Sequence, residues 1–595
     1  MNCLMTNTIL RTALAALTAP FVSTASAQTS PPPSRDTVTT PTAHLALSTP
    51  SPDWRNTGAQ EQEGAFNILL FLVDDMGWQD TSVPFWTERT PLNNRYHTPN
   101  MERLAARGMK FTQAYASAIS SPSRCSLLTG MNAARHRVTN WTMERGKSTD
   151  LQREGIVLPE WNVNGLSPVR RSVRNGSAVS TIEDADSIEL AYPATGLPQL
   201  LRDAGYHTIH CGKAHFGALG TPGEDPLNWG FDVNIAGHAA GGLATYLSEK
   251  NYGHNADGTP YALNAVPGLE KYWGTGTFIT EALTQEALAA LSYSPPYGGS
   301  WRGAPFFLYM SHYAVHIPID RDPRFYPKYE AMGLDPREAA YASLVEGMDK
   351  SLGDLLDWLD DHGQTDNTIV IFMSDNGGLA TQPEWRAGEM NTQNAPLRSG
   401  KGSLLEGGIR VPLIVSWPGV TTPGSETDIP VIIEDLFPTL LDMADIDHPE
   451  VVQPIDGRSI VPILKGSPTP PPPVRGRARS SNDRIAQSNK PSPYRGEREG
   501  DFFVWNFPNV WGNEGPAINL CCAIRQGDWK LIYHYDTGEK ELYNIPSDIG
   551  EAHNLAAKRP RTVRRLSRVL GRYLRNVDAQ RPSFSDGRTC PWPDE

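Results

Sequence analysis

The sequence has few cysteines, no long apolar segment and no excess of basic residues. It contains 6 cysteines in 595 residues, and a chain of this length can bury enough apolar surface to fold without a disulfide scaffold. No segment reaches the roughly 18 consecutive apolar residues that a transmembrane helix requires. The formal net charge of -13 argues against general binding to nucleic acids. An anionic ligand would therefore have to be held by a local positive site.

The first 63 residues predict export and a polar leader. Residues 1–27 contain one basic residue, Arg11, then a short apolar run over residues 12–22 and the tripeptide Ala25-Ser26-Ala27, which is the pattern of a cleaved signal peptide. Residues 28–63 are rich in Pro, Ser and Thr and predict a disordered leader. We expect a periplasmic or secreted protein, in which loss of Cys3 leaves five cysteines and at least one free thiol.

Continuous apolar runs alternate with helical patterns between residues 64 and 465. The runs cover residues 67–73, 305–310, 368–373 and 412–415, and such runs are typical of strands that are covered on both faces. Capped or amphipathic helices are expected at residues 98–108, 197–204 and 337–361. The alternation predicts an α/β domain with a large, mostly parallel sheet sandwiched by helices. Ligands of such sheets bind beyond the carboxyl ends of the strands.

A Pro/Arg-rich stretch separates this domain from a smaller one. Residues 466–500 include Pro471 to Pro473 and three arginines within residues 475–479, which predicts a solvated linker or loop, with a grip on an acidic polymer as the alternative. In residues 501–595, short runs near 502–507, 522–525, 529–534 and 541–543 precede a helical pattern over residues 563–574. This predicts a C-terminal α+β subdomain with an antiparallel sheet and a helix.

Pairs of polar residues follow two of the apolar runs. Asp74 and Asp75 end the first run, and Asp375 and Asn376 end the third. Adjacent buried carboxylates repel one another unless a cation or solvent relieves them, and either pair alone would also suit a solvated strand end. Three carboxylates and an amide oxygen are hard ligands, which suit Ca²⁺ or Mg²⁺ better than Zn²⁺.

Residues 120–130 read SSPSRCSLLTG. On their own they predict a turn and a helix, because Pro is favoured in the first helical turn. The spacing S-x-P-S-R-x-x-L-L-T-G resembles the signature of the formylglycine-dependent sulfatases, in the alkaline phosphatase superfamily. In that family the first residue is Cys or Ser, and a dedicated maturing enzyme oxidises it to an aldehyde, formylglycine (3-oxoalanine). The resemblance covers residues 66–574 and implies that Ser120 is modified, that Cys125 is not, and that residues 64–465 form a catalytic domain.

The resemblance also implies the remaining site residues. In sulfatases the residues that match Asp74, Asp75, Asp375 and Asn376 bind one divalent ion, most often calcium. The motif GKAHFG at residues 212–217 resembles the family's GKWHLG, with Ala in place of Trp, so that Lys213 and His215 match the pair that contacts formylglycine and sulfate. His316, in SHYAVH, matches the histidine near the leaving oxygen, and Lys401 matches the sulfate-binding lysine.

The family's mechanism follows from the stability of a sulfate ester. A serine hydroxyl would attack sulfur but remain as a stable ester, whereas a hydrated aldehyde at Ser120 avoids that trap. One hydroxyl attacks, assisted by Asp375 or the metal, and a covalent sulfo-enzyme forms. His316, with Lys401, protonates the leaving alcohol. His215 then takes the proton of the second hydroxyl and sulfate is expelled, while Arg124 and Lys213 hold the diol.

Three polar-aromatic segments, at residues 140–168, 231–246 and 503–511, are typical of sugar-binding loops. The candidate stacking side chains are Trp161, His238, Trp505 and Trp511, and the alternative is that these rings are buried in the core. The stretch NAARHRVTNW after the signature resembles the carbohydrate sulfatases. A sulfated glycan is therefore the expected substrate, with its sugar and its sulfated position left open.

Two other functions remain open at the level of the sequence. One is a phosphate or phosphonate ester hydrolase of the same superfamily that uses Ser120 unmodified. The other is a catalytically silent protein that binds sulfated glycans because Ser120 is never oxidised. The mass of the peptide that carries Ser120 separates a matured enzyme from both.

Overall fold

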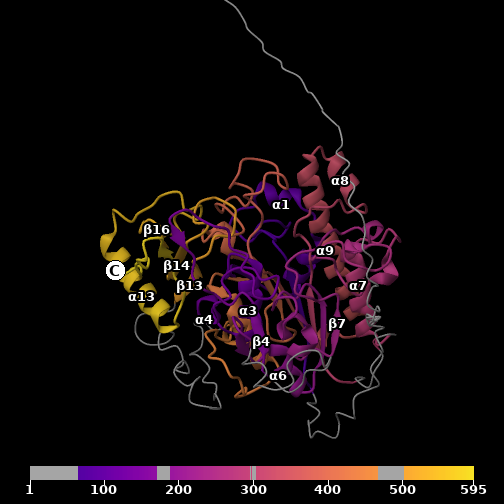
Figure 1. The fold of residues 1–595 in the computed structure, drawn as a ribbon. Coiled ribbons are helices and arrows are strands. Elements are labelled where there is room, and N and C mark those ends of the chain that lie inside the picture. The colour runs from indigo at the N-terminus through magenta and orange to yellow at the C-terminus, as the bar shows by residue number, and fades with distance from the viewer. Residues whose placement is uncertain (1–63, 170–187, 295–296, 298–302, 467–501) are drawn as a thin grey trace, which may run out of the picture. The chain divides into compact units, whose positions relative to one another are not determined.

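The computed structural model describes residues 64–169, 188–294, 297, 303–466 and 502–595 (Figure 1). The predicted signal peptide and leader, and all but the first residue of the predicted 466–500 linker, lie outside this range. Among the described residues, no helix combines the length and the apolar character that crossing a membrane requires.

Within the described residues, nine strands form one mixed sheet. They are β1 (Asn67–Val73), β2 (Met109–Tyr115), β6 (His207–Gly212), β7 (Val233–Ile235), β8 (Phe306–Ser311), β9 (Thr368–Ser374), β10 (Arg410–Ser416), β11 (Ser425–Thr427) and β12 (Val431–Ile432). The order is β11-β2-β10-β9-β1-β8-β6-β7, with β12 also beside β2. The central strands β9, β1, β8, β6 and β7 are parallel, whereas β10 is antiparallel to β9 and β2.

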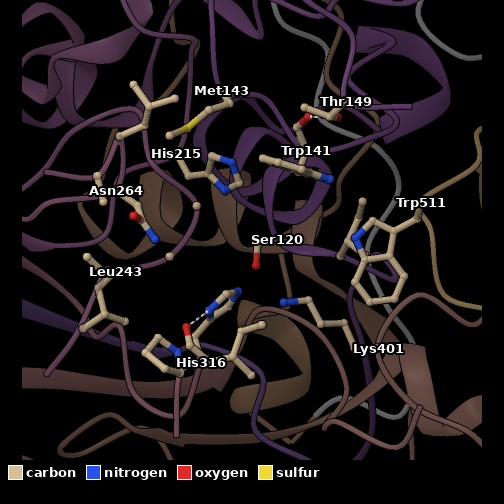
Figure 2. Close-up of a pocket in the computed structure, with 18 of the residues that line it drawn as sticks. Ser120, Trp141, Met143, Thr149, His215, Leu243, Asn264, His316, Lys401 and Trp511 are labelled. Atoms are coloured by element: carbon tan, nitrogen blue, oxygen red, sulfur yellow. Dashed lines mark hydrogen bonds between the residues drawn. The ribbon is translucent and has the colours of Figure 1, made fainter. Parts of the chain in front are cut away.

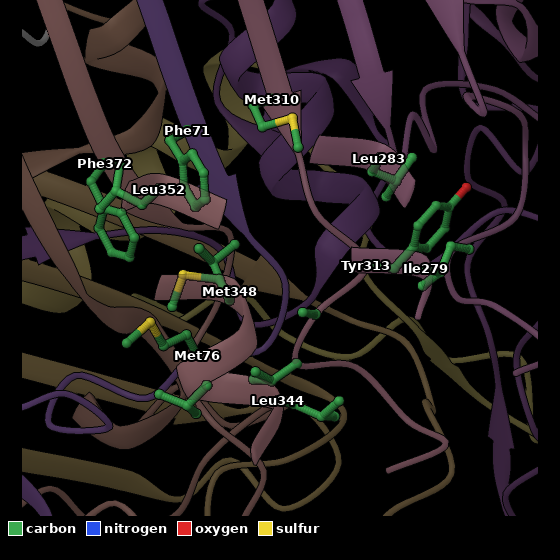
Figure 3. Packing of buried hydrophobic residues seen from close by; sticks show 14 of the residues in the cluster. Phe71, Met76, Ile279, Leu283, Met310, Tyr313, Leu344, Met348, Leu352 and Phe372 are labelled. Carbon is green, nitrogen blue, oxygen red and sulfur yellow. The ribbon is translucent and has the colours of Figure 1, made fainter. Parts of the chain in front are cut away.

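Alternate side chains of β1 enter two different cores. Leu69, Phe71 and Val73 pack with the helices α2 (Pro99–Arg107), α7 (Ile279–Leu291), α8 (Tyr326–Ala331) and α9 (Pro336–Asp361), and Figure 3 shows part of this core. Ile68, Leu70 and Leu72 pack with α3 (Ser120–Thr129), α6 (Leu197–Asp203), α11 (Leu436–Met443) and α12 (Val461–Leu464). Because successive strand side chains point to opposite faces, a wholly apolar strand requires helices on both faces.

The short remaining elements border these layers. They are α1 (Pro91–Arg95), α4 (Ala133–His136), and the paired strands β3 (Ile156–Val157) with β17 (Ser583–Phe584) and β4 (Leu166–Pro168) with β5 (Tyr192–Ala194). All five cysteines of the described residues are buried free thiols. They therefore form no disulfide with one another.

A second sheet is built from the C-terminal residues. Its strands β13 (Phe502–Phe507), β14 (Cys521–Gln526), β15 (Trp529–His534) and β16 (Lys540–Asn544) are antiparallel and adjacent in chain order. Helix α13 (Pro560–Asn576) covers one face through Leu566, Leu570 and Leu574. The other face packs Phe503 and Trp505 against residues of the large sheet's core. The predicted fold class is confirmed, while the domain boundaries stay predictions.

A buried ionic cluster joins the two sheets. Lys530 Nζ of β15 lies 3.0 Å from Glu406 Oε1 and 2.9 Å from Glu551 Oε1, and Glu406 begins α10 (Glu406–Ile409), five residues after Lys401. The backbone N–H of Glu406 donates to Glu551 Oε2 at 2.6 Å. Burial raises the pKa of Glu551 to about 7, although Lys530 acts in the opposite direction. The cluster fixes the segment that carries Lys401 to the C-terminal sheet.

Candidate active site

The carboxyl ends of four adjacent parallel strands converge at one edge of the large sheet. Asp74 and Asp75 follow β1, Asp375 and Asn376 follow β9, Lys213 follows β6, and the segment with His316 follows β8. Strands β9, β1, β8 and β6 are neighbours in that order. Residues from distant parts of the sequence therefore meet where α/β sheets usually bind their ligands.

Ser120 lies at the centre of this group. It is the first residue of α3, after the cap residue Ile119, and only 4% of it is exposed. Its Oγ lies 3.1 Å from Asp74 Oδ1 and 3.2 Å from Asn376 Oδ1, and it accepts a hydrogen bond of 2.9 Å from Lys213 Nζ. The hydroxyl thus occupies the position at which carboxylate, amide and ammonium groups meet.

Each buried carboxylate of the site is paired with a cation. Arg124 Nε donates to Asp375 Oδ2 at 2.8 Å, Lys213 Nζ lies 2.6 Å from Asp74 Oδ2, and Lys401 Nζ lies 2.7 Å from Asp75 Oδ2. Burial lowers the pKa of Lys213 to about 8, although Asp74 favours the charged form. Such pairs withstand burial because each charge retains a close partner.

Two histidines flank Ser120 and line the same cavity. His215 Nε2 lies 3.0 Å from Thr142 O, which identifies Nε2 as the protonated nitrogen, and 2.9 Å from Ser121 Oγ. His316 Nδ1 lies 2.7 Å from Ile317 O, and its Nε2 faces Asp75 Oδ2 at 3.7 Å. Burial, followed by the charge of Lys401, lowers the pKa of His316, so its imidazole is neutral at neutral pH.

A pair of glycines makes room for the two rings. A Cβ at Gly241 would lie 2.2 Å from Cε1 of His215, and a Cβ at Gly242 would lie 2.8 Å from Cε1 of His316. Because real Cβ atoms do not approach so closely, a side chain at either position would displace a ring. These glycines were missed by the sequence analysis, since a GG pair in a loop also suits a simple turn.

The acidic residues suit a divalent cation. Asp74, Asp75 and His316 each place one ligand atom within 4.8 Å of the others. The predicted ligand Asp375 is not part of that trio, because Arg124 holds one oxygen and the backbone N–H of Asp75 lies 3.3 Å from the other. Asn376 Oδ1 and Asp74 Oδ1 nevertheless both lie within hydrogen-bonding distance of Ser120 Oγ. Hard oxygen donors dominate, and they fit Ca²⁺ or Mg²⁺.

Ser120 lies within a cavity of about 850 Å³ (Figure 2). Its walls carry the aromatic side chains of Trp141, Tyr261, Trp385 and Trp511. In Figure 2, His215, His316 and Lys401 surround Ser120, and Trp511 stands beside Lys401. A cavity of this size accommodates one or more sugar rings.

Only one of the four predicted stacking side chains, Trp511, lines the cavity. Trp161 and Trp505 are buried in cores, where their indole N–H groups donate to Asp150 Oδ2 and Ala116 O. His238 is also buried, with its ring beside Tyr313. These three rings are therefore buried, which is the alternative that the sequence left open. Tyr261 and Trp385 were not predicted, because they lie in loops without a periodic pattern.

A hydroxyl among buried carboxylates and ammonium groups, at the carboxyl edge of an α/β sheet, is the kind of site that hydrolases of anionic esters use. A model of the sulfatase family matches residues 66–446. The chain therefore belongs to the sulfatase family, as its signature predicted, and it is an enzyme that hydrolyses sulfate esters.

Individual relatives cover most of the chain. A sulfatase of Formosa agariphila is 30% identical over an alignment of 540 residues, and the alignment covers 83% of this chain and 85% of that protein. The human N-acetylgalactosamine-6-sulfatase is 28% identical and covers 88% of both chains. The crystal structure of Ps i-CgsB in complex with k-i-k-neocarrahexaose superposes with a TM-score of 0.60 and 23% identity, over 87% of this chain and 93% of that one. That structure has the same fold.

Proposed function

We propose that this chain removes sulfate from a sulfated carbohydrate and that oxidation of Ser120 to formylglycine supplies its nucleophile. The observation that carries the proposal is Ser120 Oγ within hydrogen-bonding distance of Asp74, Asn376 and Lys213, inside a cavity with aromatic walls. A relative named N-acetylgalactosamine-6-sulfatase supports a sugar substrate. A hydrated aldehyde supplies a nucleophile that can release sulfate and be regenerated.

The surrounding residues have separate tasks in this proposal. Lys213 and Arg124 hold the group at position 120 and offset negative charge that develops near it. Lys401, which lines the cavity, binds a sulfate oxygen. His316 delivers a proton from Nε2 to the leaving oxygen, because Nδ1 is committed to Ile317 O, and an approaching sulfate anion favours the protonated imidazole. His215 takes the proton whose loss releases sulfate.

The proposed cation is one Ca²⁺, with Mg²⁺ as the alternative, held by oxygens of Asp74, Asp75, Asp375 and Asn376. When bound, it offsets charge on a sulfate oxygen. The proposal also requires an oxidising enzyme that accepts serine in this signature, and it places the protein in the periplasm or outside the cell.

The mass of one tryptic peptide tests the nucleophile. In protein purified from its native host, the peptide from Phe111 to Arg124 is expected to be lighter by two hydrogens than its sequence requires, because an alcohol has become an aldehyde. The measurement is mass spectrometry before and after aldehyde capture with a hydroxylamine reagent. If all of the peptide carries unmodified Ser120, the proposal is contradicted. The remaining functions are then a phosphoesterase that uses the unmodified serine and a catalytically silent binding protein.

The role of His316 predicts a dependence on the leaving group. Replacing His316 with Ala should slow hydrolysis of alkyl sulfates about 10²- to 10⁴-fold, because an alkoxide must be protonated as it leaves. Aryl sulfates with acidic phenols should lose less than about tenfold. His254→Ala is the matched control, since this ring stacks on Trp273 outside the cavity, and it should not alter the ratio. Equal losses on both substrates would refute the assignment.

A further inference from the structure

Helix α13 carries a row of arginines on its outer face. Six of its 17 residues are arginine, namely Arg561, Arg564, Arg565, Arg568, Arg572 and Arg575. Their spacing of three, four, seven, eleven and fourteen residues from Arg561 repeats with the turn of an α-helix, so that they share one face about 21 Å long. The opposite face buries Leu566, Leu570 and Leu574. We name the six residues the arginine row.

Contacts within the described residues do not explain three arginines in the N-terminal half of this row. Within the described part of the chain, no carboxylate pairs with Arg561, Arg564 or Arg568, all of which are exposed. By contrast, Arg575 donates to Asp594 Oδ1 at 2.9 Å and Arg565 donates to Gln526. Three unpaired guanidinium groups therefore stand side by side in solvent.

The arginine row also lowers the stability of α13. Like charges three or four residues apart destabilise a helix by about 0.2–0.5 kcal/mol per pair. The first turn of α13 contains no acidic residue, and Arg561 lies where the helix dipole favours negative charge. A sequence selected only for a stable helix would place glutamates here, so the row points to a ligand outside the protein.

We propose that the arginine row is a second binding site, separate from the cavity, for a sulfated polysaccharide. The chain as a whole has a net charge of -13, which repels a polyanion, so a local row of cations is needed to hold one. Guanidinium groups bind tetrahedral oxyanions through two parallel hydrogen bonds. The choice of a sulfated polymer rests on the proposed function, since under that function the arginine row would bind the enzyme's own substrate.

The placement of α13 suits a holding site rather than a catalytic one. The helix packs on β14 and β15 of the C-terminal sheet, and Figure 1 shows it on the side of that sheet away from α3, which carries Ser120. A polymer bound there keeps its other segments available to the cavity. Binding at the row should therefore lower KM for long substrates and leave kcat unchanged.

Binding is tested with the full chain and dextran sulfate, with neutral dextran as the blank. The variant Arg561→Gln/Arg564→Gln/Arg568→Gln is expected to bind dextran sulfate at least about tenfold more weakly than the unaltered protein at low salt. The difference should shrink at high salt, because ions screen exposed charges. Turnover of a small aryl sulfate should be the same in both proteins.

A second triple variant, Arg103→Gln/Arg107→Gln/Arg337→Gln, is the matched control. It removes the same charge from arginines that already pair with Asp357, Asp360 and Asp335, and it should bind dextran sulfate like the unaltered protein. Equal binding by all three proteins would overturn the proposal. So would tighter row-dependent binding to duplex DNA or to phosphatidylglycerol vesicles. Binding of dextran sulfate is measured without turnover, so it tests the arginine row independently of catalysis. A protein that binds dextran sulfate through the row but does not hydrolyse sulfate esters would refute the proposed function and leave the binding site supported.

Discussion

Replacing Ser120 with Ala is expected to lower kcat on sulfate esters by at least about 10⁴-fold, which is the scale of losing a nucleophile. The fold should survive, because the substitution removes one oxygen from a site where Lys213 keeps Asp74 as its partner at 2.6 Å. Circular dichroism and the urea midpoint check folding, and hydrolysis of an aryl sulfate checks activity.

Two further variants make this result specific. Ser126→Ala removes another buried hydroxyl of α3, one that contacts His136 rather than the cavity, and it should retain activity within about threefold. Ser120→Cys should regain activity only in a host that oxidises cysteine in this signature. Substantial turnover by Ser120→Ala would move the nucleophile elsewhere and remove the basis of the proposed mechanism.

The second large effect is expected on stability. Lys530→Met should destabilise the protein by about 3–5 kcal/mol, since it leaves the buried carboxylate of Glu551 without its cation, whereas Glu406 keeps Arg410 Nη1 at 3.3 Å. Lys530 and its partners Glu406 and Glu551 are fully buried, so water cannot replace the lost ammonium group. The urea midpoint measures the change, and exposed Lys558→Met should alter stability by less than about 0.5 kcal/mol.

The cost of Lys530→Met should depend on pH. Burial raises the pKa of Glu551 to about 7, above its value in an unfolded chain, so the folded protein takes up a proton there as the pH falls. A neutral Glu551 needs no partner, and the destabilisation should be smaller near pH 6 than near pH 8. A cost that is constant across this range would show that Glu551 keeps its charge. The double variant Lys530→Met/Glu551→Gln should recover part of the loss.

The strands that sequence patterns predict best are those with no polar residue in their interior. β1 and β9 begin where their apolar runs begin, because both faces of each strand are buried. β6 was missed because His207 and His210 interrupt its apolar pattern. Burial lowers the pKa of His210 to about 3, so this histidine enters the core as a neutral ring. The sequence also did not predict that β10 is antiparallel to its neighbours, since an apolar run does not indicate the direction in which a strand runs.

The end of α2 at Gly108 was predicted correctly, but glycine is required there for another reason than the prediction assumed. The sequence predicts that this glycine ends α2, and the helix does end at Arg107. Its φ of -124° is not left-handed, so conformational freedom is not the reason for glycine. A Cβ here would lie 2.5 Å from the carbonyl oxygen of Val415 in β10. The residue is small because the chain passes close to a strand some 300 residues later in the sequence.

The polar centre of the site was more predictable than its walls. The ends of apolar strands indicated the four predicted metal ligands, and the resemblance to the sulfatases supplied the six predicted catalytic residues. All ten lie at or around Ser120. The cavity walls depend on loop packing, which sends Trp161 and Trp505 into cores and Trp511 into the cavity. An indole ring suits either place, so composition alone does not decide between them.

The C-terminal contribution to the cavity has a consequence for biosynthesis. Ser120 emerges early from the ribosome. Trp511 and Asn513, which line its cavity, and Lys530, which binds Glu406 near Lys401, emerge about 400 residues later. Until those residues are synthesised, the part of the cavity wall formed by Trp511 and Asn513 is missing. In the finished protein only 4% of Ser120 is exposed. We therefore expect the proposed oxidation of Ser120 to take place before residues 502–595 have been synthesised and folded.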